Sequence, residues 1–212
     1  MIALAARLLQ ALPQTQCTRC GYPDCAGYAQ AIEAGEAGID QCPPGGAEGV
    51  ARLSGITGKP AGTVDPRFGV EGPRAVAVID EAWCIGCTLC LDACPTDAIV
   101  GIHKRMHTVI EPHCTGCELC IPVCPVDCIS LEVVTPGRSG WQAWSQAEAD
   151  HARERYEARK MRRIGQSPAA TDSSDASPEP PASAADRKRA IVEAALARAR
   201  AAKSPGPSSG KP

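Results

Sequence analysis

The sequence predicts an α+β protein in which a small, mainly helical domain with four cysteines precedes a duplicated domain and a partly helical, partly disordered tail. Three observations predict this organisation: 13 cysteines grouped in runs, a repeat in the middle of the chain, and a change of composition after Thr135. Aromatic residues make up only 3% of the chain, whereas glycine and proline number 20 and 19. Such a composition favours small, loop-rich units that are held together by something other than a large apolar core.

The repeat relates residues 76–100 to residues 106–130. Each half predicts a strand, a cysteine loop, a short helix and a second strand. Matching residues lie at the same positions in both halves. They are Glu81 and Glu111, Gly86 and Gly116, Leu89 and Leu119, Pro95 and Pro125, and Asp97 and Asp127.

The cysteine spacing indicates the chemistry of this repeat, because each half contains the run C-x2-C-x2-C-x3-C-P. In bacterial ferredoxins three cysteines of such a run hold one [4Fe–4S] cluster, and the fourth crosses to the other cluster. Zinc would explain two CxxC pairs but not the third thiol, the fourth thiol or the proline. The predicted ligand sets are Cys84, Cys87, Cys90 and Cys124 for one cluster, and Cys114, Cys117, Cys120 and Cys94 for the other.

The N-terminal region carries a further quartet, Cys17, Cys20, Cys25 and Cys42, with the spacing C-x2-C-x4-C-x16-C. Four thiolates suit either zinc or an iron–sulfur cluster, so the spacing alone leaves both open. Apolar periodicity predicts helices over residues 2–12, 24–34 and 47–53 around this quartet.

Residues 12–32 and 39–46, followed by the two ferredoxin runs, closely resemble the RnfB family, a component of the Rnf-type ion-translocating electron transport complex. The resemblance includes the elements Cys-Gly-Tyr-Pro and Cys-Pro-Pro-Gly-Gly and covers about residues 8–135. It implies a [4Fe–4S] cluster on the N-terminal quartet, and therefore three clusters in all. Family members usually begin with a hydrophobic membrane helix, which we do not expect here because sixteen residues precede Cys17.

We expect six segments along the chain. They are a four-cysteine domain at 1–61, a linker at 62–74, a ferredoxin domain at 75–135, a helical extension at 136–165, a disordered linker at 166–184, and a basic helix and tail at 185–212. Within the extension a helix is predicted over residues 141–163, with Trp141 and Trp144 holding its start against the ferredoxin domain.

Several other residues invite a functional interpretation. Cys128 aligns with Ala98, so a buried small residue is favoured over a reactive thiol. His103, His107 and His113 lie between the repeats, where solvated histidines are favoured over metal-binding or proton-coupled groups. A solvated helix is favoured over an anion-binding surface for the basic tail residues Arg153, Arg155, Arg159, Lys160, Arg162 and Arg163, and for Arg187, Lys188 and Arg189.

The resemblance implies an electron-transfer subunit that passes low-potential electrons between cytoplasmic carriers and a membrane complex, with no catalytic site of its own. We expect redox partners, chiefly other subunits of that complex, and no nucleic acid and no membrane span. The protein is expected in the cytoplasm or at the cytoplasmic face of the inner membrane. A net charge of −6 over residues 75–135 favours a basic partner surface. The alternatives are a soluble ferredoxin-like donor and a zinc-stabilised adaptor that binds nucleic acid.

Overall fold

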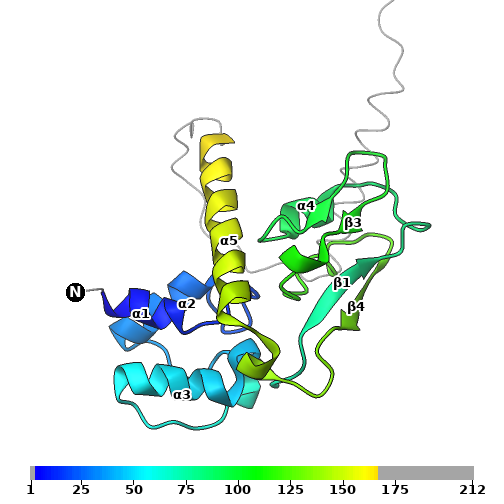
Figure 1. Cartoon of the computed structure of the whole chain (residues 1–212). Helices are drawn as coiled ribbons and strands as arrows, with labels where there is room; N and C mark the ends of the chain where they lie inside the picture. Colours follow the sequence, from blue (N-terminus) through cyan, green and yellow to red (C-terminus); the bar gives the residue numbers. More distant parts are fainter. Residues whose placement is uncertain (1–2, 167–212) are drawn as a thin grey trace, which may run out of the picture. The chain divides into compact units, whose positions relative to one another are not determined.

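Three helices form the N-terminal part of the computed structural model, which describes residues 3–166 (Figure 1). They are α1 (Leu4–Gln10), α2 (Cys25–Ala34) and α3 (Gly46–Thr57). The three helices predicted in this region are confirmed, although the third is longer than predicted. It continues to Gly58, which ends it in the left-handed conformation at a φ of 73°.

The apolar faces of these helices enclose a small core. Its most buried side chains are Leu8, Leu12, Tyr28, Val50 and Leu53. The Tyr28 hydroxyl donates to Gly38 O at 2.8 Å and accepts from Gln41 N at 3.1 Å. Because Gln41 directly precedes Cys42, this buried tyrosine fixes the loop that presents the last cysteine of the quartet.

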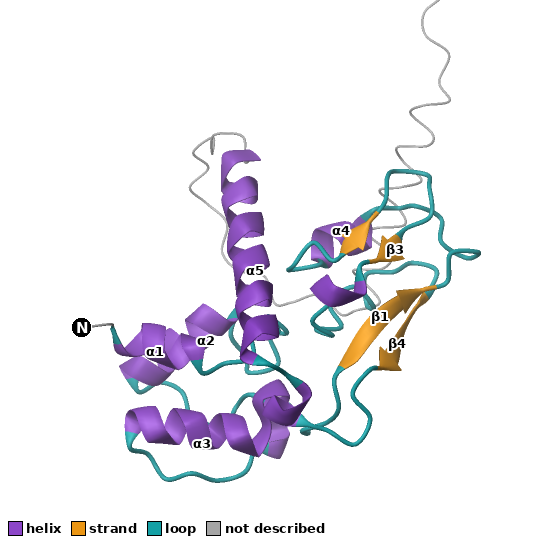
Figure 2. Ribbon diagram, in the orientation of Figure 1, coloured by secondary structure: helices purple, strands orange, loops and turns teal. Residues whose placement is uncertain are grey.

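Two small antiparallel sheets follow (Figure 2). β1 (Ala75–Ile79) pairs with β4 (Ile129–Val133), and β2 (Ile99–Val100) pairs with β3 (Thr108–Val109). The register runs from Ala75 opposite Val133 to Ile79 opposite Ile129. The first strand therefore pairs with the last, so that the two halves of the repeat are joined by backbone hydrogen bonds.

Backbone angles in this region recur at an offset of thirty residues. The φ angles agree within 3° at three matched pairs of positions in the left-handed region. The pairs are Gly86 and Gly116 at 67° and 65°, Thr88 and Glu118 at 69° and 66°, and Asp97 and Asp127 at 48° and 50°. The matching residues of the sequence repeat thus have matching conformations.

The short helix predicted in both halves is present only in the first, as α4 (Leu89–Ala93). In the second half, residues 119–123 form turns and a bend, and the prediction of a helix there was wrong. In α4 the Asp92 N–H donates to Thr88 O at 3.4 Å. Pro122 occupies the matching position in the second half and has no N–H to donate, so this helical hydrogen bond cannot form.

Gly116 lies where the second cysteine loop packs against the start of β1. A Cβ at this position would overlap the carbonyl oxygen of Ala75, and the φ of 65° is unfavourable for any other residue. We expect Gly116→Ala to destabilise the protein by more than about 2 kcal/mol, measured as a lower anaerobic unfolding temperature. Gly62→Ala is the matched control, since nothing lies within 4 Å of its Cβ position; an equal loss in both variants would contradict this explanation.

The last described element is α5 (Gln146–Gln166). The predicted helical start at Trp141 was wrong, because Gly140–Ala143 form a 3-10 turn and Trp144 is extended. A capping box explains the later start: Ser145 Oγ accepts from Glu148 N at 3.2 Å, and Glu148 Oε2 accepts from Ser145 N at 2.8 Å.

The predicted disordered linker, apart from its first residue, and the predicted basic helix at 185–212 lie outside the described residues. Within residues 3–166 no helix combines the length and the apolarity that a bilayer span requires.

Candidate metal centres

The four N-terminal cysteines line one cavity together with Leu12, Thr15, Tyr28 and other residues. Burial raises the pKa of Cys25 and Cys42 well above the ordinary thiol value, and neighbouring cysteines of the same quartet raise both further. Thiolates in this cavity would repel one another at neutral pH unless a cation lay between them.

Local backbone geometry brings these thiols together. Cys25 is the first residue of α2, whose N-cap Asp24 accepts from Gly27 N at 2.6 Å. Gln16 is buried in a left-handed conformation at a φ of 53°, and its Oε1 accepts from Cys25 N at 3.0 Å. This side chain ties the loop that carries Cys17 to the start of α2.

A second cavity is lined by cysteines from both halves of the repeat. Cys84, Cys87 and Cys90 come from the first half, and Cys124 comes from the second. Burial raises the pKa of Cys90 to about 11, and Cys87, Cys84 and Cys124 add to the rise. The structure therefore places Cys124 with the first three thiols of the other run.

The remaining cysteines of the two runs are also neighbours. Burial raises the pKa of Cys120 to about 12, and Cys117, Cys114 and Cys94 raise it further. The pKa of Cys117 is likewise raised to about 12, mainly by burial, with Cys94 and Cys114 contributing. The structure thus brings Cys94 to the second run, as the crossed ligand sets require.

Backbone N–H groups point at four of these sulfur atoms. The donors in the two halves of the repeat lie thirty residues apart. Two of the bonds cross between the halves and two lie within one half. The crossed bonds run from Ala77 N to Cys114 Sγ at 3.4 Å and from His107 N to Cys84 Sγ at 3.3 Å. The local bonds run from Ala98 N to Cys94 Sγ at 3.2 Å and from Cys128 N to Cys124 Sγ at 3.4 Å.

His107 is a buried residue of this site, and the prediction that it is a solvated loop histidine was wrong. Its side chain is 1% exposed, and Nδ1 lies 3.3 Å from Cys90 Sγ. The sequence repeat holds the signal that was missed, because position 107 matches Ala77 and both donate their N–H to a cysteine of the other run. The predicted solvation holds for His103, which is exposed, while His113 is half-buried beside His151.

Cys128 is half-buried, and its Sγ lies 3.5 Å from Cys124 Sγ. Its pKa is raised to about 12, first by burial and then by Cys124. It lines the same cavity as Cys84 and Cys124, so this small residue packs directly against the candidate centre.

The shape of these sites favours a polynuclear group over one ion. Within residues 3–166 no three Cys, His, Asp or Glu side chains lie close enough together to hold a single metal ion. The thiols instead line cavities together with apolar side chains. Thiolate donors around enclosed apolar space fit an iron–sulfur cluster.

The N-terminal centre and the second cysteine run contact each other. Thr115 is buried, and its Oγ1 donates to Thr15 O at 3.0 Å. Thr15 lines the N-terminal cavity, and Thr115 directly follows Cys114. Arg19 forms an ion pair with Glu118 across the same contact. Two of the candidate centres are therefore neighbours through a hydrogen-bonded contact.

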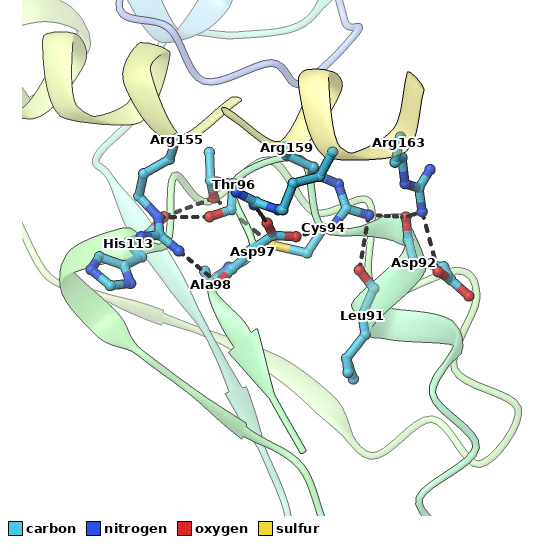
Figure 3. Close-up of polar contacts among 11 residues, drawn as sticks. Leu91, Asp92, Cys94, Thr96, Asp97, Ala98, His113, Arg155, Arg159 and Arg163 are labelled. Carbon is cyan, nitrogen blue, oxygen red and sulfur yellow. Dashed lines mark hydrogen bonds and ion pairs between the residues drawn. The ribbon is translucent and has the colours of Figure 1, made fainter. Parts of the chain in front are cut away.

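Part of the basic face of α5 packs on the protein (Figure 3). The prediction of a solvated basic helix was wrong for Arg155 and Arg159, which are half-buried, whereas Lys160, Arg162 and Arg163 are exposed. The reason is that its side chains find acceptors in two other segments. Arg155, Arg159, Arg162 and Arg163 bond to atoms of residues 91–97, and Lys160 and Tyr156 bond to Asp24.

These contacts also change the charge expected for the central segment. At least three of its eight carboxylates form ion pairs with arginines from outside residues 75–135. They are Asp92, Asp97 and Glu118. Steering of a basic partner toward this segment is therefore weaker than the count of charges suggests.

Comparison with known proteins bears on what the cavities hold. The family described as "4Fe-4S dicluster domain" matches residues 77–131, and the family described as "Putative Fe-S cluster" matches residues 12–44. These two ranges contain all twelve cysteines of the candidate centres. The chain therefore carries iron–sulfur domains in both regions.

Curated relatives match over a longer range, and they are named as the B component of the ion-translocating oxidoreductase complex. The protein of Azoarcus sp. strain BH72 is 62% identical over 133 residues, which cover 63% of this chain and 71% of the relative. That of Alkalilimnicola ehrlichii is 52% identical over 144 residues, or 67% of this chain and 76% of the relative. The order of the two iron–sulfur regions and this extent of identity show that the chain belongs to the RnfB family, the B component of ion-translocating oxidoreductase complexes.

Proposed function

We propose that this protein carries electrons one at a time through three [4Fe–4S] clusters. The N-terminal cluster is held by Cys17, Cys20, Cys25 and Cys42. A duplicated ferredoxin domain at 75–135 holds the other two with crossed ligands. One set is Cys84, Cys87, Cys90 and Cys124, and the other is Cys114, Cys117, Cys120 and Cys94.

The single observation that carries this proposal is the sorting of twelve cysteines into three groups of close neighbours. The pKa of Cys25, of Cys90 and of Cys120 is raised in each case by the other three cysteines of its own quartet, in addition to burial. Two of the groups also each line one cavity. Four thiolates on one zinc ion would converge on one point, whereas within residues 3–166 no three such side chains lie close enough together to hold a single ion.

When bound, each cluster supplies reversible one-electron chemistry that the side chains lack. The residues of this chain fix where the clusters lie and what surrounds them. Apolar side chains such as Ile79 and Ile129 line the ferredoxin-type cavity and exclude water. The four N–H groups directed at sulfur stabilise negative charge there, and both effects set a reduction potential.

The partners follow from the family. Its named relatives are subunits of ion-translocating oxidoreductase complexes. We infer that this chain exchanges electrons with other subunits of such a complex and with a cytoplasmic carrier, at the cytoplasmic face of the inner membrane. A soluble carrier outside any complex is the competing function, and pull-down of tagged protein from membranes and cytosol separates the two.

The metal content of anaerobically purified protein tests the proposal. Three clusters of four irons predict twelve iron atoms and twelve acid-labile sulfides per chain, with signals of reduced [4Fe–4S] clusters in electron paramagnetic resonance. Cys17→Ala should lower both numbers to about eight and leave the two ferredoxin-type signals. Zinc without labile sulfide, or colourless protein that a strong reductant does not change, would exclude the proposed cofactors.

A further inference from the structure

Helix α5 holds one loop of the ferredoxin-type region with several arginines (Figure 3). Arg159 Nη2 donates to Leu91 O at 3.0 Å and to Asp92 O at 2.6 Å, and Arg159 also pairs with the Asp97 carboxylate. Burial lowers the pKa of Arg159, while the charge of Cys94 acts in the opposite direction. The Arg159 guanidinium is thus close enough to Cys94 to interact with it electrostatically.

Arg155 differs from its neighbours on the helix. It is half-buried, and both of its acceptors are backbone carbonyls: its Nε donates to Thr96 O at 2.7 Å and its Nη2 donates to Asp97 O at 3.0 Å. Among the described residues it forms no ion pair, whereas Arg159, Arg162 and Arg163 pair with aspartates. The positive charge of Arg155 is therefore not cancelled by a carboxylate.

The peptide group that Arg155 contacts is the one that faces the sulfur. Asp97 O and Ala98 N belong to the same peptide unit, and Ala98 N donates to Cys94 Sγ at 3.2 Å. A cation on the carbonyl oxygen of a peptide polarises it and makes its N–H a stronger donor. Arg155, the 97–98 peptide and Cys94 Sγ therefore form one hydrogen-bonded chain.

We propose that Arg155 is a positioning residue that raises the reduction potential of the cluster held by Cys94, Cys114, Cys117 and Cys120. This inference rests on the proposed function, because it concerns a cluster that the function assigns to these residues. One-electron reduction adds a negative charge that spreads onto the ligand sulfurs. A stronger N–H donor and an uncancelled positive charge both favour the reduced state, so the potential rises.

The internal repeat allows the 97–98 peptide to be compared with its counterpart in the second half. The matching unit in the second half is the 127–128 peptide, whose Cys128 N donates to Cys124 Sγ at 3.4 Å. Both units place an aspartate in the left-handed conformation before the donor, Asp97 at a φ of 48° and Asp127 at 50°. The Arg155 guanidinium lies on the first unit. The two ferredoxin-type clusters thus share a backbone frame, and the inference concerns the cation on the first unit.

The test is a redox titration of the full chain, purified anaerobically, reduced stepwise with dithionite and followed by electron paramagnetic resonance. In Arg155→Gln we expect the equilibrium constant for reduction of one cluster to fall about tenfold, which is about 59 mV for a one-electron couple. The other clusters should move by less than about a third of that. Arg155→Lys keeps the charge and should recover part of the shift.

Arg153→Gln is the matched control. It removes the same charge two residues away on α5, where Arg153 Nε donates to Glu157 at 2.7 Å on its own helix. A shift in Arg155→Gln that equals the shift in Arg153→Gln, or that moves all clusters alike, would overturn the inference. Iron and sulfide analysis on the same samples distinguishes failure of this inference from failure of the proposed function. Full cluster content without a selective shift in potential rejects only the role of Arg155. Absence of the clusters rejects the proposed function.

Discussion

Cys94→Ala is expected to remove the cluster of the second cysteine run and to spare that of its own run. Iron per chain should fall from about twelve to about eight, as one cluster of four irons is lost. The reason is spatial, because the charge of Cys94 acts on Cys117 and Cys120, while Cys124 lines the cavity of Cys84, Cys87 and Cys90. Anaerobic iron and sulfide analysis measures the loss.

Double variants show which thiols share a cluster. If the ligands cross, Cys94→Ala combined with Cys117→Ala removes one cluster and leaves about eight irons. Cys94→Ala combined with Cys87→Ala then removes two clusters and leaves about four. If each run instead held its own cluster, the first double variant would leave about four irons and the second about eight. One comparison therefore decides between the two arrangements. Cys128→Ala is the control within the same domain and should keep about twelve irons, since Cys128 belongs to none of the three quartets.

The ferredoxin-type region could be predicted in detail from the sequence because its constraints are local and repeated. Cysteine spacing, glycine positions and proline positions recur thirty residues apart, and the structure repeats the backbone angles at Gly86 and Gly116. Family matches in both regions and the named relatives confirm the resemblance to the RnfB family. The exact ligand sets and the count of three clusters stay predictions until the metal content is measured.

The role of His107 could not be predicted from composition and periodicity. A solvated loop was expected because the sequence shows no ordered partner for a histidine between the two repeats. Its burial depends on the fold of the whole domain, which brings residue 107 against Cys84 and Cys90. Contacts between distant segments leave no signal in hydrophobic patterning, although the repeat does relate position 107 to Ala77.

The packing of α5 could not be predicted from hydrophobic patterning either. Polar and charged residues dominate α5, and a sequence of this kind predicts a solvent-exposed helix. The helix nevertheless packs through hydrogen bonds, since Arg155 and Arg159 reach carbonyl groups of residues 91–97. Backbone acceptors are independent of residue type, so the sequence of residues 91–97 shows only Asp92 and Asp97 as possible partners for arginines.

Trp141→Ala is expected to cause the largest loss of stability outside the cysteines. The indole is 2% exposed, its Nε1 donates to Ala11 O at 3.1 Å, and the Arg52 guanidinium lies 3.8 Å above its ring. These contacts place it on the N-terminal helices, so the predicted packing of Trp141 against the ferredoxin domain was wrong. Loss of a buried tryptophan costs about 3–5 kcal/mol, which should lower the anaerobic unfolding temperature by roughly 10 °C.

The control is Trp83→Ala, because that side chain is 69% exposed and its removal should change the unfolding temperature little. Trp141 also connects the N-terminal helices to the segment that leads into α5, so its loss should make α5 more accessible to a protease. Equal unfolding temperatures for Trp141→Ala and the unmodified protein would contradict this assignment. The α5 arginines and Tyr156 would then be the main contacts that hold the helix, since they bind residues 91–97 and Asp24 independently of Trp141.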